Sequence, residues 1–337
     1  MTSARTPGVC YAQTVTGQEL PVIDVTNPAF SLGAPSDTEM AALIQKSAAE
    51  QERFNGMPAF LRKRSMWLMS RRSVLMRGVM GADGTFLAGM NTYLMKLGPA
   101  NLGRGFGSVD RALASSIPAI SLRLRLKEIV RLLADTVGPV LAATSGRPFH
   151  LINIAGGPCM DSINLLIQLR RDRPGVFDGR PVRIHALDLE SPGPIFGGRA
   201  LQALKAPGMP LAELDVILEH TPYQWSEPRQ LQSCLGKLDL TESVVAAASE
   251  GGLFDYGTDD EIRGNLEVLH AMTPMHAVVA VTTTPVDGPG RAFNQTSGAR
   301  TVSRSREAFA ELSAAARWKV VSFAKVLMND VLILGKN

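Results

Sequence analysis

The stretch FHLINIAGGPCMD, residues 149–161, decides the fold of this chain. Its apolar first half predicts a buried strand over Phe149–Ile154, and its small residues predict a tight turn at 155–157. Helical spacing over Ser162–Arg170 follows at once. Such a strand–turn–helix unit presents free backbone N–H groups and a helix N-terminus to a ligand. We therefore expect a binding site at this turn.

Strand-length apolar runs alternate with helical patterns from the quoted stretch to the end of the chain. Strands are expected at 149–154, 182–187, 215–218, 243–247, 277–282, 319–325 and 331–334. Helices are expected at 162–170, 195–205, 228–235, 259–272 and 304–316. This alternation predicts a parallel sheet covered on both faces, and the short link before the last strand predicts an antiparallel hairpin. The fold class is therefore α/β, with a Rossmann-like, seven-stranded, mostly parallel sheet and an antiparallel C-terminal strand.

The part before residue 146 has a different texture. Residues 1–36 show little periodicity and predict an extended N-terminal arm. Residues 37–145 predict an all-α domain, with helices over Phe60–Val79, Phe86–Leu97 and Ser121–Val137. Gly138-Pro139 is expected to end or kink the last of these helices.

Composition sets bounds on partners and compartment. The 337 residues carry a net charge of +4, a modest excess that does not argue for a nucleic-acid partner. No run approaches the roughly 20 apolar residues that cross a bilayer, and the N-terminus lacks a signal-peptide core. The three cysteines are far apart, which favours a reducing cytoplasm. The five histidines show no metal-ligand spacing, so no metal site is expected.

Five β/α steps, a helix and a closing strand hairpin resemble the class I S-adenosylmethionine-dependent methyltransferase fold over residues 146–337. Residues 37–145 look like the helical domain that caps the substrate pocket or forms a dimer in many small-molecule methyltransferases. The resemblance implies S-adenosylmethionine as cofactor, a small-molecule substrate and a homodimer through the helical domain.

The first family motif reads hydrophobic-Asp-hydrophobic-Gly-x-Gly-x-Gly. In this sequence Asn153 stands where the motif has its carboxylate, and Gly157 is the middle glycine. Ala155 and Cys159 replace the first and last glycines. The resemblance implies that Asn153 and the turn Ala155, Gly156 and Gly157 contact the cofactor. The alternative for Asn153 is a polar side chain satisfied by nearby backbone.

The second family motif is an acid that ends the next strand and accepts hydrogen bonds from the ribose hydroxyls. Asp188 fits this position, with Glu190 as a second candidate, and the insertion 171–179 lengthens the interval from the turn. The alternative for Asp188 is a strand-end cap. Aromatic side chains can stabilise a sulfonium or flank the adenine, and the candidates are Tyr93, Tyr223, Trp225 and Tyr256. The alternative for each of them, and the more common role of such side chains, is packing.

Residues after the third and fourth strands are the candidates for catalysis. Glu250 and His220 are possible general bases, and Tyr256 lies where the family places methyl-transfer residues. Glu250 could instead cap a helix, and His220 could be structural. The predicted reaction is methyl transfer to a small, partly apolar acceptor.

Three other functions remain open at this point. The altered glycine motif and the lack of a clear base leave room for a repurposed fold, such as an enzyme that cyclises S-adenosylmethionine to azetidine-2-carboxylate and releases methylthioadenosine. An NAD(P)-dependent oxidoreductase is a further alternative, although Gly156-Gly157-Pro158 fits GxGxxG poorly. The last alternative is a binding module without activity.

Overall fold

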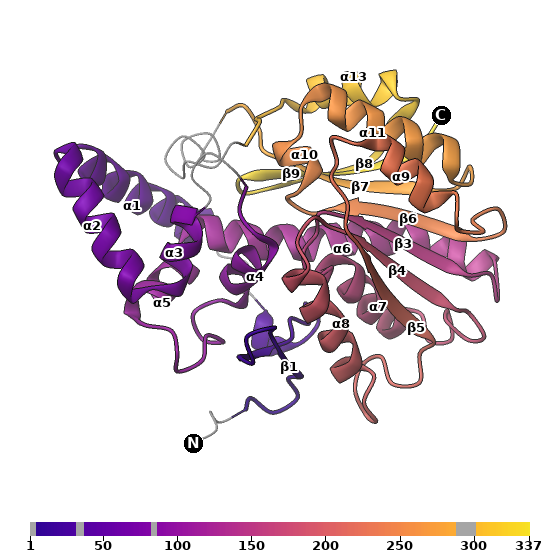
Figure 1. Cartoon of the computed structure of the whole chain (residues 1–337), viewed down its shortest axis with the longest axis horizontal. Helices are drawn as coiled ribbons and strands as arrows, with labels where there is room; N and C mark the ends of the chain where they lie inside the picture. Colours follow the sequence, from indigo (N-terminus) through magenta and orange to yellow (C-terminus); the bar gives the residue numbers. More distant parts are fainter. Residues whose placement is uncertain (1–4, 32–36, 82–85, 288–300) are drawn as a thin grey trace.

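Seven strands form one sheet in the order β5-β4-β3-β6-β7-β9-β8 in the computed structural model (Figure 1). The structure describes residues 5–31, 37–81, 86–287 and 301–337. The strands are β3 (Phe149–Ile154), β4 (Val182–Leu187), β5 (Val216–Thr221), β6 (Val244–Ser249), β7 (Val278–Thr283), β8 (Trp318–Val326) and β9 (Asn329–Lys336). Strands β3 to β7 are parallel, and β9 runs antiparallel to both β7 and β8. The predicted seven-stranded sheet with one antiparallel C-terminal strand is confirmed.

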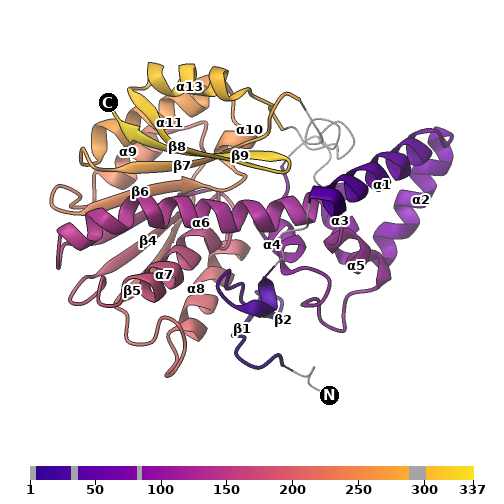
Figure 2. The same ribbon diagram turned by 180° about the vertical axis from the view of Figure 1, so that it is seen from behind.

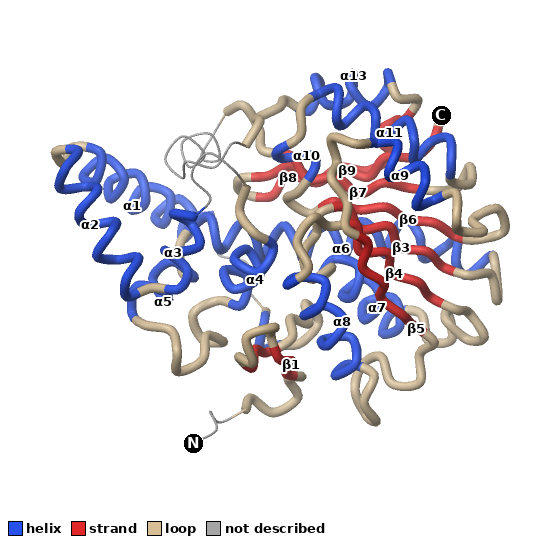
Figure 3. The backbone as a smooth tube through the Cα atoms, in the orientation of Figure 1, coloured by secondary structure: helices blue, strands red, loops and turns tan. Residues whose placement is uncertain are grey.

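Helices cover both faces of this sheet, as Figure 3 shows. One layer holds α6 (Ile117–Ala143), α7 (Met160–Asp172) and α8 (Pro192–Leu204). The other holds α9 (Pro228–Leu235), the single turn α10 (Leu253–Tyr256), α11 (Asp259–Met272) and α13 (Arg306–Ala315). Successive strand residues point to opposite faces, so Phe149 and Leu151 join the core under α6 and α7, whereas Ile152 and Ile154 join the core under α11. All six residues of β3 are buried, which explains its unbroken apolar pattern.

The N-terminal part contains a small hairpin and a set of helices. Within the expected arm, β1 (Tyr11–Gln13) pairs antiparallel with β2 (Glu19–Pro21), followed by the short helix η1 (Pro28–Phe30). The helices are α1 (Asp37–Asn55), α2 (Ala59–Arg72), α3 (Val74–Gly81), α4 (Gly89–Leu97) and α5 (Ser108–Ala114). Helices α1 and α2 extend away from the sheet in Figure 1.

Two expectations for the helical part were wrong in detail. The helix expected over 60–79 breaks at Ser73, whose hydroxyl accepts from the N–H of Met76 at 2.9 Å and donates to Asp110 at 2.6 Å. The hydroxyl therefore satisfies one of the free N–H groups that begin α3. Conversely, α6 continues through Pro139 to Ala143. It lies along the sheet beside α7, as Figure 2 shows from behind. Within the described ranges, no helix is both long and apolar enough to span a bilayer.

Candidate functional site

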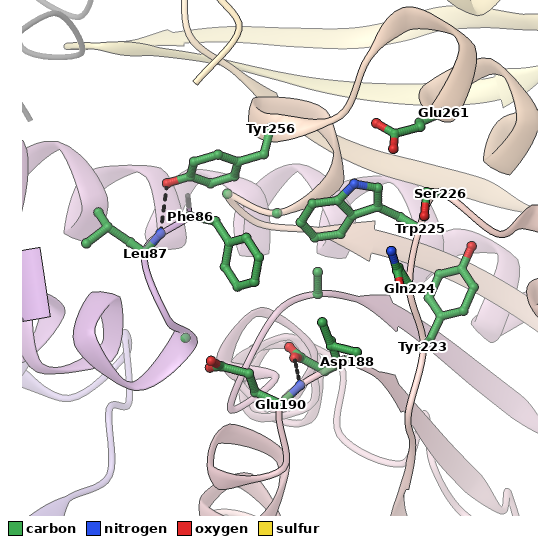
Figure 4. A pocket seen from close by; sticks show the side chains of 15 residues that line it. Phe86, Leu87, Asp188, Glu190, Tyr223, Gln224, Trp225, Ser226, Tyr256 and Glu261 are labelled. Atoms are coloured by element: carbon green, nitrogen blue, oxygen red, sulfur yellow. Dashed lines mark hydrogen bonds between the residues drawn. The ribbon is translucent and has the colours of Figure 1, made fainter. Parts of the chain in front are cut away.

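A cavity of about 660 Å³, including its open mouth, lies at the carboxyl ends of β3, β4, β5 and β6 (Figure 4). Backbone of the turn after β3, carboxylates after β4, and aromatic side chains after β5 and β6 line it, together with Phe86 and Leu87 from the segment before α4. Strand β3 pairs with β4 on one side and β6 on the other, so the chain order reverses there. Ligands bind at such switch points in parallel α/β sheets.

The turn after β3 adopts an unusual backbone at three alternating positions. Ala155, Gly157 and Cys159 have φ angles of +53°, +56° and +55°. These are the three glycine positions of the methyltransferase motif. A left-handed backbone costs a non-glycine residue roughly 1–2 kcal/mol, so the surrounding structure holds Ala155 and Cys159 in strained conformations.

Gly157 also explains how the helical part approaches the turn. A Cβ atom on Gly157 would lie 2.7 Å from the Cα of Gly89, the first residue of α4. Backbone therefore packs directly on backbone at this point. Gly89 and Ala155 both line the cavity, so the helical part forms one of its walls.

Asp188 stands at the end of β4 and lines the cavity next to Glu190. Its Oδ2 accepts from the N–H of Gly157 and its Oδ1 from the N–H of Glu190, both at 2.9 Å. Burial raises the pKa of Asp188, and these two backbone hydrogen bonds oppose the rise. Burial likewise raises the pKa of Glu190, and the Asp188 charge adds to that rise. Each Asp188 oxygen keeps a further lone pair for a ligand hydroxyl.

Aromatic rings form the opposite side of the cavity. The Phe86 ring packs edge-on against Trp225, with centroids 5.8 Å apart, and against Tyr256 at 6.4 Å. Figure 4 shows Phe86 lying between these two side chains. The Tyr256 hydroxyl accepts from the N–H of Leu87 at 3.5 Å, and burial raises its pKa to about 12. Tyr256 is therefore a neutral hydroxyl at physiological pH.

Asn265 in α11 holds the loop that carries Tyr223 and Trp225. Its Oδ1 accepts from the Tyr223 hydroxyl at 2.5 Å, and its Nδ2 donates to the carbonyls of Trp225 and Glu261, each at 2.8 Å. The Asn265 side chain is fully buried. It ties the aromatic wall after β5 to a rigid helix.

Glu250 lies behind the cavity wall in a buried ionic cluster. Its Oε2 pairs with Lys96 of α4, and its Oε1 accepts from Arg125 of α6 at 3.0 Å. The same Arg125 also contacts Asp255 at 3.2 Å. Gly251 has a φ angle of +76°, which favours glycine, and a Cβ there would lie 2.3 Å from the Arg125 guanidinium that the two carboxylates hold in place. Both oxygens of Glu250 are thus engaged, and its side chain is only 3% exposed.

Asn153 lies beneath the turn and does not line the cavity. Its Nδ2 donates to Asp161 at 2.5 Å and to the Ser162 hydroxyl at 3.1 Å. Its Oδ1 and the Oδ2 of Asp161 have no partner among the described residues. Burial, followed by the nearby Glu250 charge, raises the pKa of Asp161 to about 6.

Two other candidates from the sequence also lie outside the cavity lining. His220 hydrogen-bonds to the backbone carbonyl of Asp188 at 2.9 Å. Tyr93 is buried, donates to the carbonyl of Pro21 at 2.5 Å and packs against Phe196. The structure thus gathers Ala155, Asp188, Glu190, Tyr223, Trp225 and Tyr256 around one cavity, with Gly157 bonded to Asp188. It leaves Asn153, Gly156, Gly157, Glu250, His220 and Tyr93 outside that lining.

Sequence reasoning missed Phe86, Leu87, Gly89 and Glu261 as cavity residues. Of these four residues, only Glu261 belongs to a recognisable sequence motif. Thr258-x-x-Glu261 is a capping box, which indicates the start of α11. Phe86 and Leu87 belong to the helical part. No sequence pattern around them indicates that they face the carboxyl ends of the strands. Among the described residues, no group of three or more His, Cys, Asp or Glu side chains is placed to hold a metal ion.

No protein-family model matches the chain, and no curated protein does either. Among solved structures, a possible exported protein from Bordetella parapertussis is 14% identical and superposes with a TM-score of 0.56. That comparison covers 92% of this chain and 99% of the other.

Two methyltransferase structures, both containing S-adenosylhomocysteine, show a weaker likeness. The magnesium protoporphyrin IX methyltransferase from Synechocystis PCC 6803 is 12% identical over 64% of this chain and 87% of its own, with a TM-score of 0.41. The 1,6-didemethyltoxoflavin-N1-methyltransferase from Burkholderia thailandensis is 19% identical over 60% and 76%, with a TM-score of 0.38. The strand order and the antiparallel β9 confirm the resemblance at the level of the fold: the chain has the α/β architecture of class I methyltransferases.

Proposed function

We propose that this protein is an S-adenosylmethionine-dependent methyltransferase acting on a small, partly apolar acceptor. The observation that carries the proposal is the position of Asp188, a carboxylate at the end of β4 that reaches the turn after β3 and lines the cavity. A dinucleotide-binding sheet of the order 3-2-1-4-5-6 would also carry such an acid. The inserted antiparallel strand β9 favours the methyltransferase alternative.

The residues that line the cavity fit S-adenosylmethionine. Asp188 and Glu190 would accept from its ribose hydroxyls, a charge-assisted pairing. Ala155 and the neighbouring turn would face the cofactor through their backbone, while Trp225 and Phe86 offer ring faces to the adenine or to the sulfonium. When bound, this cofactor supplies an electrophilic methyl group, so the protein needs to orient a nucleophile and exclude water.

The geometry favours catalysis by positioning over general-base catalysis by Glu250. Both Glu250 oxygens are paired with cations, and a base needs an oxygen free to receive a proton. Tyr256 is the predicted catalytic residue that lines the cavity, and its neutral hydroxyl can donate a hydrogen bond to the acceptor. We infer that Tyr256 orients the acceptor and that Glu250 and His220 support the site from outside.

The test combines binding with product identification. Calorimetry of the purified chain with S-adenosylmethionine and S-adenosylhomocysteine should show saturable binding, and NADH should show none. The protein is then incubated with S-adenosylmethionine, with and without panels of small phenols, amines and N-heterocycles. S-adenosylhomocysteine that appears only with an acceptor supports methyl transfer. Methylthioadenosine released without an acceptor would instead establish cyclisation, and failure to bind either nucleoside would refute the proposal.

We also infer that the enzyme works in the cytoplasm. The three cysteines are all free in the structure, and Cys159 is buried. Burial raises its pKa well above the usual range, which leaves it a small packing residue. Fractionation of the native host would test this inference, and recovery from an extracytoplasmic fraction would contradict it.

A further inference from the structure

Helix α6 carries an arginine whose charge has no partner. Arg123 is half-buried and its Nε atom is fully buried, yet its guanidinium forms no hydrogen bond or ion pair within the described ranges. Burial lowers the pKa of Arg123, as expected for a cation without a counter-charge. A buried polar group without a partner costs folding free energy, so its presence calls for an explanation.

Three buried arginines of the same chain show the usual arrangement. Arg125 pairs with two carboxylates. Arg180 donates to four backbone carbonyls. Arg304 donates to one carboxylate and two carbonyls. Each of them is held by acceptors of this chain, and Arg123 differs from all three.

Arg123 lines a narrow cavity between α4 and α6, two helices seen in Figure 2. The cavity has three cationic side chains, Lys96, Arg123 and Lys127, and no carboxylate in its lining. The rest of the lining is apolar and consists of Ile23, Val25, Phe30, Leu124 and Leu126. It shares no lining residue with the cavity at the strand ends. An unpaired guanidinium therefore borders a mostly apolar space.

The charges around this cavity do not balance. Lys96 pairs with Glu250, which takes one of the three donors of its ammonium group. Lys127 is exposed and has no salt bridge in the part of the chain that the structure describes. Asp24 belongs to the segment that forms one wall, but its Oδ1 accepts from the N–H and the hydroxyl of Thr26, at 2.8 and 2.7 Å. Arg123 and Lys127 therefore remain as two uncompensated positive charges.

Hydrogen bonds fix the apolar walls in place. Asn164 of α7 accepts from the N–H of Val25 at 2.8 Å and donates to the carbonyl of Ile23 at 3.0 Å. Asn101 donates to the carbonyl of Ala29, next to the short helix end that lines the cavity, at 2.9 Å. The cavity is thus a preformed part of the fold.

The guanidinium rests on the backbone that ends α4. Gly98 follows this helix with a φ angle of +75°, and a Cβ there would lie 2.1 Å from an Nη atom of Arg123. The carboxyl end of a helix carries only roughly half an elementary charge, which does not balance a guanidinium. A planar carboxylate matches the arginine fork in charge and shape. A phosphate would leave further oxygens against apolar walls without donors.

We propose that this cavity binds the carboxylate group of a small organic acid, with Arg123 as its main partner. The carboxylate accepts from the Arg123 guanidinium and from a free donor of Lys96, and the exposed Lys127 adds its charge. The enclosed space is narrow, so the head group enters it and the apolar walls contact the adjoining carbons. This site is separate from the cofactor cavity and does not depend on the reaction proposed above.

Ligand titration of the whole chain tests the proposal. Butyrate is the probe, and butyramide, a neutral molecule of the same shape, is its control. Butyrate should raise the unfolding midpoint in a saturable manner, and it should shift the Nε–H signal of Arg123 in a nitrogen–proton NMR spectrum. Butyramide should do neither. The variant Arg123→Lys has no Nε–H and identifies the signal by its disappearance.

Variants locate the site. Arg123→Met should raise the Kd for butyrate at least tenfold, because it removes charge-assisted hydrogen bonds. Arg123→Lys should raise it by a smaller factor, since it keeps the charge but loses the fork. Arg131→Met is the matched control and should leave the Kd unchanged. It makes the same change of charge on the same helix, at an exposed side chain that pairs with Glu128 and Asp135.

Four results would overturn the proposal. The first is no saturable response to butyrate up to tens of millimolar, which would mean that the end of α4 alone holds Arg123. The second is equal binding of butyramide, since the cavity would then recognise an apolar group without its charge. The third is inorganic phosphate that binds more tightly than butyrate and displaces it. The fourth is a butyrate Kd that neither Arg123→Met nor Arg123→Lys changes, which would place the ligand elsewhere.

Discussion

Replacement of Asp188 gives the sharpest test of the proposed cofactor site. In the structure this carboxylate accepts hydrogen bonds from the backbone N–H groups of Gly157 and Glu190, and each oxygen keeps a lone pair for a ligand. Asp188→Ala removes the charge and every acceptor, whereas Asp188→Asn keeps the shape and one acceptor oxygen. Comparing the two variants separates the charge from the geometry.

The expected size of the effect follows from one charge-assisted hydrogen bond. Such a bond contributes about 1.5–3 kcal/mol. Its loss in Asp188→Ala should therefore raise the Kd for S-adenosylhomocysteine by about 10- to 150-fold. Asp188→Asn should give a smaller increase because one neutral acceptor remains. The loss of the two backbone hydrogen bonds should also lower the free energy of unfolding by about 1–2 kcal/mol in the alanine variant.

Calorimetric titration at several pH values measures these effects. Because burial raises the pKa of Asp188, its carboxylate takes up a proton at a higher pH than an ordinary aspartate does. Wild-type affinity should therefore fall as the pH drops through that raised pKa, while Asp188→Asn should keep only the smaller fall that comes from Glu190, whose pKa burial also raises. Asp215→Ala is the matched control, since it removes an exposed acid just before β5, at the amino ends of the strands and away from the cavity. Unchanged affinity in Asp188→Ala, with the control also unchanged, would refute the role of Asp188.

Three further predictions concern side chains around the turn and the aromatic wall. Gly157→Ala should lower the free energy of unfolding by more than about 2 kcal/mol in a urea titration, because it adds a clashing Cβ at a positive φ; an unaffected midpoint would contradict the close backbone packing. The buried Asp161 has a pKa of about 6, so its ionisation destabilises folded wild-type protein as the pH rises from 4 to 7. The free energy of unfolding of Asp161→Asn, which cannot ionise, should therefore rise relative to that of wild type by up to about 3 kcal/mol over this range. A difference that stays constant with pH would contradict this prediction. Asn265→Ala should raise the KM for S-adenosylmethionine more than it lowers kcat and should shift the fluorescence of Trp225, whereas an unchanged KM and spectrum would mean that Asn265 does not position the loop.

Much of the α/β part could be predicted because its signals are local. Buried strands such as β3 are continuous apolar runs, and the capping box at Thr258 marks where α11 begins. The helical part was harder to predict. At Ser73 and Pro139, tertiary contacts rather than local residue preferences determine whether the helix breaks or continues. Ser73 breaks the helix by hydrogen-bonding Asp110 from a distant segment. Pro139 is tolerated near the end of α6, a helix held by its packing against α7 and the sheet.

The site was predictable where it follows from the strand ends and unpredictable where it depends on distant partners. The position of Asp188 follows from the length of β4 alone. Glu250 looked like a free base because Lys96 and Arg125 lie 154 and 125 positions earlier in the chain. No local pattern links these residues. The same holds for Phe86, which reaches the cavity only because α4 packs on the turn at Gly157.

The buried ionic cluster around Glu250 limits which segments of the chain can be exchanged between homologues by recombination. Its two cations belong to α4 and α6, whereas Glu250 and Asp255 follow β6. A crossover near residue 145 between divergent homologues would leave carboxylates or cations stranded in an apolar interior. Descendants that exchange the helical half must therefore inherit the 250–255 segment with it, so the two halves should share one evolutionary history.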